Sequence, residues 1–152
     1  MAKLAFKFEV RLVITGELLD PDLITQQVGL QPSKAYRKGD PVSWADKVQP
    51  RFRARAIYKH GSWQLASRVE PQSELEDHVR DLMAQVRPCW DAMRAAIQQH
   101  DGDLDCAAYG YEYVPALWLP AELLSEIGGL GLSLGISVYD STKSRSADET
   151  GD

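Results

Sequence analysis

Alternating apolar and polar side chains predict a strand near the start of the chain. From Phe6 to Ile14 every second side chain is apolar, which is the period of a strand with one buried face. A short helix should follow, because Asp20 suits the N-cap and Pro21 suits the first helical position, where its missing N–H needs no partner. Gly29 can adopt the left-handed conformation that commonly ends a helix. This part of the chain therefore predicts a strand followed by a capped helix.

A second alternating segment predicts a hairpin. In residues 52–58 (FRARAIY) apolar side chains occupy every second position, so the pattern places Arg53 and Arg55 on the opposite face of a strand. Residues 62–67 (SWQLAS) then predict the return strand after a short turn. Strand two and strand three of the protein are therefore expected here.

A long apolar stripe predicts a helix in the middle of the chain. Apolar side chains recur at three- and four-residue steps between Leu75 and Ile97, the spacing of one helix face. Ser73 and Glu76 have the spacing of a capping box at its start. Because Pro88 falls inside the stripe without changing its phase, we expect one kinked helix or two nearly coaxial helices.

The remaining patterns complete the expected fold. Residues 104–113 predict a strand, a third helix should open at Pro120 and stop at Gly128, and residues 132–138 predict the last strand. The order is β-α-β-β-α-β-α-β. It predicts an α+β protein, a two-layer α/β sandwich with a ferredoxin-like antiparallel or mixed sheet, one long kinked helix and two short helices. The second face of the sheet should be open or covered by a partner.

The chain resembles the bacterial "domain of unknown function 4279" family. The matching segments, in order, are 9–16 (EVRLVITG), 19–21 (LDP), 29–33 (GLQPS), 37–41 (RKGDP), 63–67 (WQLAS), 75–78 (LEDH) and 131–139 (GLSLGISVY). Two features depart from the family pattern: a longer basic insert between Pro41 and Phe52, and Leu119 in place of a polar cap before the third helix. The resemblance implies a small bacterial α+β domain and brings no established activity.

Length and composition predict one domain without a cofactor. The chain has 152 residues, enough for one domain with its own core. We expect that domain to span residues 1–140 and to be followed by a disordered polar tail, residues 141–152, which has no apolar side chain except Ala147.

The two cysteines, Cys89 and Cys106, lack metal-binding spacing. With neither a signal-peptide core nor a run long enough to span a membrane, the expected location is the cytoplasm.

The charge of the chain is unevenly distributed. Between Lys34 and Arg68 there are nine basic residues and two acidic ones, a local net charge of +7. Since the whole chain has a formal net charge of −5, the remainder carries −12. This basic segment is either a solvated loop or a positive patch that faces an anionic partner.

No enzyme signature accompanies these elements. Residues 101–112 superficially resemble a calcium loop, but Cys106 occupies the sixth position, where the loop needs glycine. The three histidines have no nucleophile or metal ligand at an informative spacing, and His78, between Glu74 and Asp81, is the best of them. We therefore expect no catalytic residue, metal or cofactor.

The expected binding residues are cations and tyrosines of the open sheet face and the basic segment. They are Arg37, Lys38, Arg53, Arg55, Tyr109, Tyr111 and Tyr113. Arginine and tyrosine are enriched at protein-binding hot spots, and the same residue types stack bases and contact phosphates in single-stranded RNA platforms. Alternatively, the tyrosines pack beneath Trp118 or the basic segment.

We therefore expect a non-catalytic bacterial interaction domain with a protein partner. An immunity-type inhibitor that binds a cognate toxin is its most specific form. The alternative is a nucleic-acid or nucleotide-binding module, although a sequence pI near 5.2 opposes binding to a polyanion. An enzyme centred on His78 ranks last.

Overall fold

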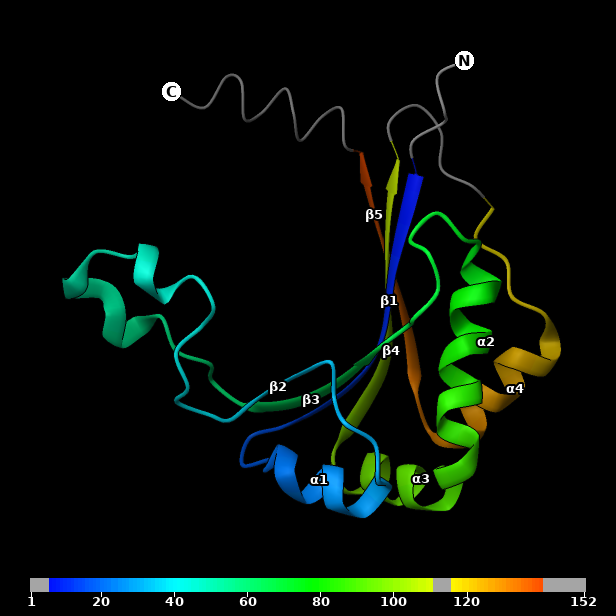
Figure 1. Ribbon diagram of the computed structural model, residues 1–152, viewed down its shortest axis with the longest axis horizontal. Coiled ribbons are helices and arrows are strands. Elements are labelled where there is room, and N and C mark those ends of the chain that lie inside the picture. Colours follow the sequence, from blue (N-terminus) through cyan, green and yellow to red (C-terminus); the bar gives the residue numbers. More distant parts are fainter. Residues whose placement is uncertain (1–5, 111–115, 141–152) are drawn as a thin grey trace.

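The computed structural model describes residues 6–110 and 116–140 (Figure 1). The predicted tail, residues 141–152, lies outside this part of the chain. Five strands form one sheet: β1 (Phe6–Gly16), β2 (Lys34–Tyr36), β3 (Gly61–Ala66), β4 (Asp101–Gly110) and β5 (Ser133–Asp140).

The sheet has the order β2-β3-β1-β4-β5 and is mixed. All neighbouring strands are antiparallel except β4 and β5, which are parallel. The first four strands and their helical connections give the ferredoxin-like arrangement, and β5 extends it by one strand. The predicted fold class is therefore confirmed.

Four α-helices cover one face of the sheet (Figure 1). They are α1 (Pro21–Val28), α2 (Leu75–Val86), α3 (Trp90–Gln99) and α4 (Ala121–Leu130). The 3₁₀ turn η3 (Arg87–Cys89) joins α2 to α3 at Pro88, so the predicted kink is confirmed. Figure 1 shows α3 turned across the end of the sheet, so the two helices are not coaxial. Among the described residues, no helix is long and apolar enough to cross a membrane.

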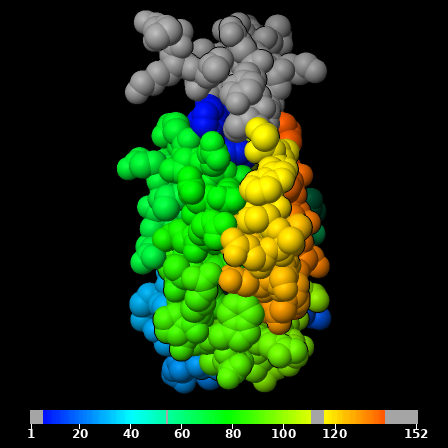
Figure 2. All heavy atoms as spheres, turned by 90° about the vertical axis from the view of Figure 1, so that its right-hand side faces the viewer, coloured from blue at the N-terminus to red at the C-terminus, as the bar shows by residue number. Residues whose placement is uncertain are grey.

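The core lies between this helix layer and the sheet. Alternate side chains of β1, from Phe8 to Ile14, are almost completely buried, and in the β1–β3 register Ile14 and Leu12 lie opposite Trp63 and Leu65. Figure 2 shows α2 and α4 packed side by side over this layer. No helix of the described residues lies on the opposite face of the sheet, which leaves that face available for a site.

Helix α1 has the predicted caps. The Asp20 carboxylate accepts a hydrogen bond of 3.0 Å from the N–H of Asp22, and Pro21 is the first helical residue. Gly29 adopts the left-handed conformation, with φ of 74°, and its N–H donates to the carbonyl of Thr25 at 2.8 Å. These local signals fix both ends of the helix.

Replacing Gly29 with alanine should lower the free energy of unfolding by about 1 kcal/mol, because a side chain is unfavourable at positive φ. No atom lies within 4 Å of the added Cβ, so the loss comes from backbone conformation alone. The matched control is Gly128→Ala within α4, which is also unobstructed and should stabilise by about 0.5–1 kcal/mol. Urea denaturation of both variants measures the two effects, and equal shifts would contradict the prediction.

The predicted strand at residues 52–58 is wrong. Residues Pro50–Arg55 form a 3₁₀ helix, η2, and the strand that pairs with β3 is Lys34–Tyr36 instead. Phe52 is 41% exposed and Ala56 is 3% exposed, so the alternating apolar positions do not form one buried face. Arg53 and Arg55 consequently do not lie on the sheet.

Two helix boundaries also differ from the prediction. Helix α2 begins at Leu75 with Glu74 as its N-cap and no side-chain cap, so the Ser73 capping box does not form. Helix α4 continues through Gly128 to Leu130, and Gly131 is its C-cap. The buried side chain of Leu130 explains the longer helix, because its contacts with the core offset the weak helix preference of glycine.

Candidate functional site

The uncovered face of the sheet holds a shallow polar groove. Its volume is about 320 Å³. The lining side chains include Glu9 and Arg11 from β1, Asp105 from β4, and Ser137 and Tyr139 from β5. Because side chains alternate along a strand, these residues share the face opposite the helices. The open face predicted from the pattern of β1 is therefore present.

The floor of the groove has mixed charge. Arg11 Nη1 approaches Gln64 Oε1 at 3.5 Å, near the limit of a hydrogen bond. Partial burial, followed by the neighbouring Asp103 carboxylate, raises the pKa of Asp105, while Arg11 opposes this shift. Carboxylates on the groove floor would repel phosphates, so this face is poorly suited to a polyanion.

Two tyrosines stack at the edge of the groove. The rings of Tyr109 and Tyr139 have centroids 5.0 Å apart and an interplanar angle of 16°. Lys7 Nζ lies 5.0 Å from the Tyr109 centroid, within the range of a cation–π contact. Tyr109 is thus on the predicted face, whereas Tyr111 and Tyr113 lie outside the described residues.

A projecting segment, residues 37–60, forms what we call the arm. Its two sides are held together near the sheet: Tyr58 N–H donates to the Asp40 carbonyl at 2.9 Å, and Val42 N–H donates to the Ala56 carbonyl at 3.0 Å. The tip contains the 3₁₀ helices η1 (Ala45–Lys47) and η2. Figure 1 shows the arm projecting on the side of the sheet away from α2 and α4.

The tip of the arm exposes aromatic and basic side chains together. Trp44 is 55% exposed and Phe52 41% exposed, and the Arg51 guanidinium lies 4.7 Å from the Phe52 ring centroid. Arg53 and Arg55 are also exposed. In the described part of the chain, neither arginine has a carboxylate partner.

Arg37 and Lys38 instead anchor the base of the arm. Arg37 Nη2 lies 2.7 Å from Asp20 Oδ1 and 2.6 Å from Asp22 Oδ2, at the start of α1. Hydrogen bonds to these two carboxylates raise the pKa of Arg37. Lys38 Nζ lies 3.0 Å from Glu17 Oε1. The structure therefore does not bring the predicted site residues together. Arg37 and Lys38 form ion pairs at the base of the arm, Arg53 and Arg55 are exposed at its tip, and Tyr109 lies on the sheet.

The binding residues predicted from the sequence did not include the aromatic residues of the arm. Trp44 and Phe52 are the large exposed apolar side chains of the tip. The available signal was their position within a basic, proline-interrupted segment, since exposed aromatics beside arginines are typical of hot spots. Tyr139 was also missed, although strand alternation places it beside Tyr109.

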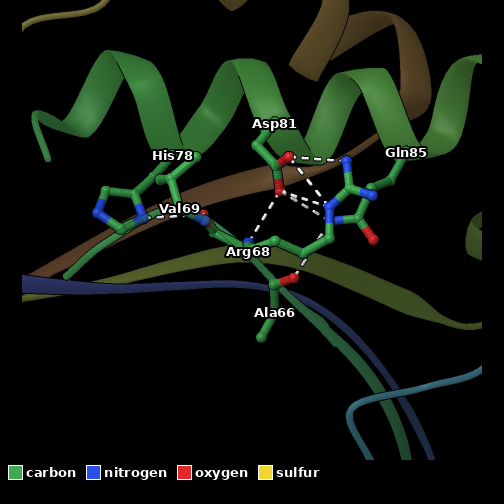
Figure 3. A network of polar contacts seen from close by, with 7 residues as sticks. Ala66, Arg68, Val69, His78, Asp81 and Gln85 are labelled. Carbon is green, nitrogen blue, oxygen red and sulfur yellow. Dashed lines mark hydrogen bonds and ion pairs between the residues drawn. The ribbon is translucent and has the colours of Figure 1, made fainter.

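His78 is buried in a polar network between β3 and α2 (Figure 3). Its Nδ1 lies 2.9 Å from Ser67 Oγ, while its Nε2 has no hydrogen-bond partner among the described residues. Asp81 pairs with Arg68 at 2.8 Å rather than with the imidazole. Within the described residues the imidazole contacts a hydroxyl and is hydrogen-bonded to no carboxylate, unlike the histidine of a catalytic triad.

Burial lowers the pKa of His78. The carbonyls of Pro71 and Ser73 and the carboxylates of Asp77 and Asp81 act in the opposite direction, but less strongly. The imidazole is therefore neutral at neutral pH. Its protonation would place an unsolvated charge beneath α2.

The cysteine thiols are not activated. Burial raises the pKa of Cys106 to about 12 and also raises the pKa of Cys89. Both thiols are therefore protonated at neutral pH, and the thiolate is the reactive form.

Within residues 6–110 and 116–140, no three His, Cys, Asp or Glu side chains form a group that could hold a metal ion. The calcium-loop resemblance falls in β4, where Cys106 is buried in the core.

Comparison with known proteins places the chain in one family. The family model described as "Domain of unknown function (DUF4279)" matches residues 6–141. The search found no matching curated protein and no matching solved structure. The matched region includes every described strand and helix, together with the arm and the groove. The chain therefore belongs to the DUF4279 family.

Proposed function

We propose that this protein is a non-catalytic bacterial interaction domain whose arm binds an acidic surface of a protein partner. The observation that carries the proposal is the tip of the arm, where Trp44 and Phe52 are exposed on the same segment as Arg53 and Arg55, which have no carboxylate partner among the described residues. Aromatic residues and arginine supply most of the energy at protein interfaces. Anchoring by Arg37 lowers the entropy lost when the arm binds.

The specific form that we propose is an immunity-type inhibitor in the bacterial cytoplasm, which binds a cognate toxin and covers its active site. A projecting arm supports this role, because a protruding segment can enter a concave active site. An arm with exposed cations also suits a partner whose site is acidic.

A nucleic-acid or nucleotide-binding module is the second candidate. The observation in its favour is the stack of Tyr109 on Tyr139 with Lys7 beside it, because stacked rings and a cation suit a base and a phosphate. Glu9 and Asp105 in the adjoining groove oppose it, as does the net charge of −5.

The double variant Arg53→Glu/Arg55→Glu should abolish partner binding and leave the fold intact. Both side chains are exposed, so the free energy of unfolding should change by no more than about 0.5 kcal/mol for each substitution. The measurement is quantitative affinity capture from host lysate, followed by titration of the purified partner. The matched control is Arg94→Glu, a charge reversal on the exposed side of α3 that should retain the partner.

Titration with short single-stranded RNA separates the two candidates. Wild type should show no measurable binding. If it binds such RNA with an affinity that falls steeply as salt is added, the protein-binding proposal gives way to the nucleic-acid candidate. If the double variant keeps the same captured partner at wild-type affinity, the arm is not its binding site.

A further inference from the structure

The edge strand β5 has a charged residue only at its last position, Asp140, and is otherwise without the features that normally protect a sheet edge. It is the outermost strand and pairs only with β4 among the described strands. Residues 133–139 (SLGISVY) contain no charge and no proline, and natural proteins usually use one of these to prevent edge-to-edge pairing. The opposite edge, β2, has only three residues. The unpaired edge of β5 is therefore the one suited to adding a strand.

An apolar row follows this edge. Leu134, Ile136 and Val138 are 39%, 38% and 53% exposed although they point to the helix side of the sheet. In Figure 2 α4 and α2 lie side by side, and no other described helix lies on the far side of α4. The outer part of the helix side of β5 consequently remains uncovered.

Helix α4 extends the row. On the side of α4 that faces α2, Glu122 pairs with Arg80 at 2.7 Å. Leu124, 48% exposed, lies about 200° further around the helix and so faces away from α2, toward the β5 edge. The apolar surface at this edge therefore combines β5 and α4, while the carboxylate of Glu122 points elsewhere.

We propose that two copies of this chain pair antiparallel through β5, with Ile136 at the two-fold axis. In this register Leu134 lies opposite Val138 of the second copy on the helix side. On the open face Gly135 lies opposite Ser137, and Ser133 lies opposite Tyr139. Apolar residues thus meet apolar ones, and the one large side chain on the open face meets a small one.

A second copy suits this edge better than a charged peptide. No charged side chain occurs along residues 133–139, so two copies with net charge −5 can meet here without opposing carboxylates, and a charged peptide would find no complementary charge. Pairing also closes the assembly, because a two-fold contact uses both β5 edges and leaves only the short β2 edges. This inference does not depend on the proposed function.

Sedimentation of the full chain tests the proposal. Wild type should sediment with twice the chain mass of 17.0 kDa. Ile136→Lys should sediment with the single-chain mass over the same concentration range, because the lysine of one copy would face the same lysine of the other copy. The control is Leu23→Lys, which adds the same charge at an exposed apolar position of α1 and should leave the dimer intact. Circular dichroism checks the folding of both variants.

Amide hydrogen exchange on wild type decides the case in which Ile136→Lys fails to fold. Exchange from β5 should slow as the chain concentration is raised, while exchange from β2 should not change. A single-chain mass for wild type, a folded Ile136→Lys that remains dimeric, or β5 exchange that is independent of concentration would each overturn the proposal.

Discussion

Replacing Trp63 with alanine is expected to lower the free energy of unfolding by about 3–5 kcal/mol. The Trp63 side chain is completely buried in the layer between the sheet and the helices, and its Nε1 donates to Thr25 Oγ1 of α1 at 3.0 Å. The substitution leaves a cavity and removes the partner of this hydroxyl. Against a typical total stability of about 5–15 kcal/mol, the loss would be large. Urea denaturation followed by circular dichroism measures it.

Trp44→Ala is the matched control, because it makes the same chemical change at a position that is 55% exposed on the arm. It should alter the free energy of unfolding by no more than about 0.5 kcal/mol. A further variant, Thr25→Val, removes the hydrogen bond without emptying the core and should lose about 1 kcal/mol. Equal losses for Trp63→Ala and Trp44→Ala would show that the core is not organised around Trp63.

Local signals explain why the first strand and helix could be predicted from the sequence. The ends of α1 depend on Asp20, Pro21 and Gly29, and the capping hydrogen bonds at these ends involve only residues within four positions along the chain. The kink at Pro88 has the same origin, because proline removes a helical hydrogen bond wherever it occurs. Such features do not depend on the rest of the fold.

The second strand could not be predicted because its evidence is tertiary. Residues 34–36 are too few to show an alternating pattern, and they are a strand because they pair with residues 62–64 of β3. Residues 52–58 do alternate, but they lie in the arm and do not pair with a strand of the sheet, although Ala56 is buried. Alternation predicts a strand only where a partner strand is present.

Only part of the candidate site could be predicted, because some of its features depend on local patterns and others on tertiary contacts. Strand alternation was sufficient to place Tyr109 on the open face. The pairing of Arg37 with Asp20 joins residues 17 positions apart, and no local pattern reveals that its charge is already partnered. The groove requires β1, β4 and β5 to lie side by side, which follows only from the sheet order.

Acidification should destabilise the protein through His78. Its pKa is lowered in the folded state, mainly by burial, whereas an unfolded histidine has a pKa near 6.5. Below about pH 6.5 the unfolded chain therefore binds a proton that the folded chain does not, and the free energy of unfolding decreases as the pH falls toward the folded pKa. One proton of difference gives a slope of at most about 1.4 kcal/mol per pH unit.

Urea denaturation at a series of pH values between about 7 and 5 measures this slope. The variant His78→Gln should be less stable at neutral pH and should lose the part of the slope that His78 contributes, because glutamine does not titrate; Asp105, whose pKa is raised by burial, contributes with the opposite sign in both proteins. Asp81, whose pKa is lowered below 3.8 by Arg68 and Gln85 despite its partial burial, affects stability only at lower pH and does not obscure the result. If His78→Gln retained the wild-type slope, a group other than His78 would carry the difference in bound protons between the folded and unfolded states.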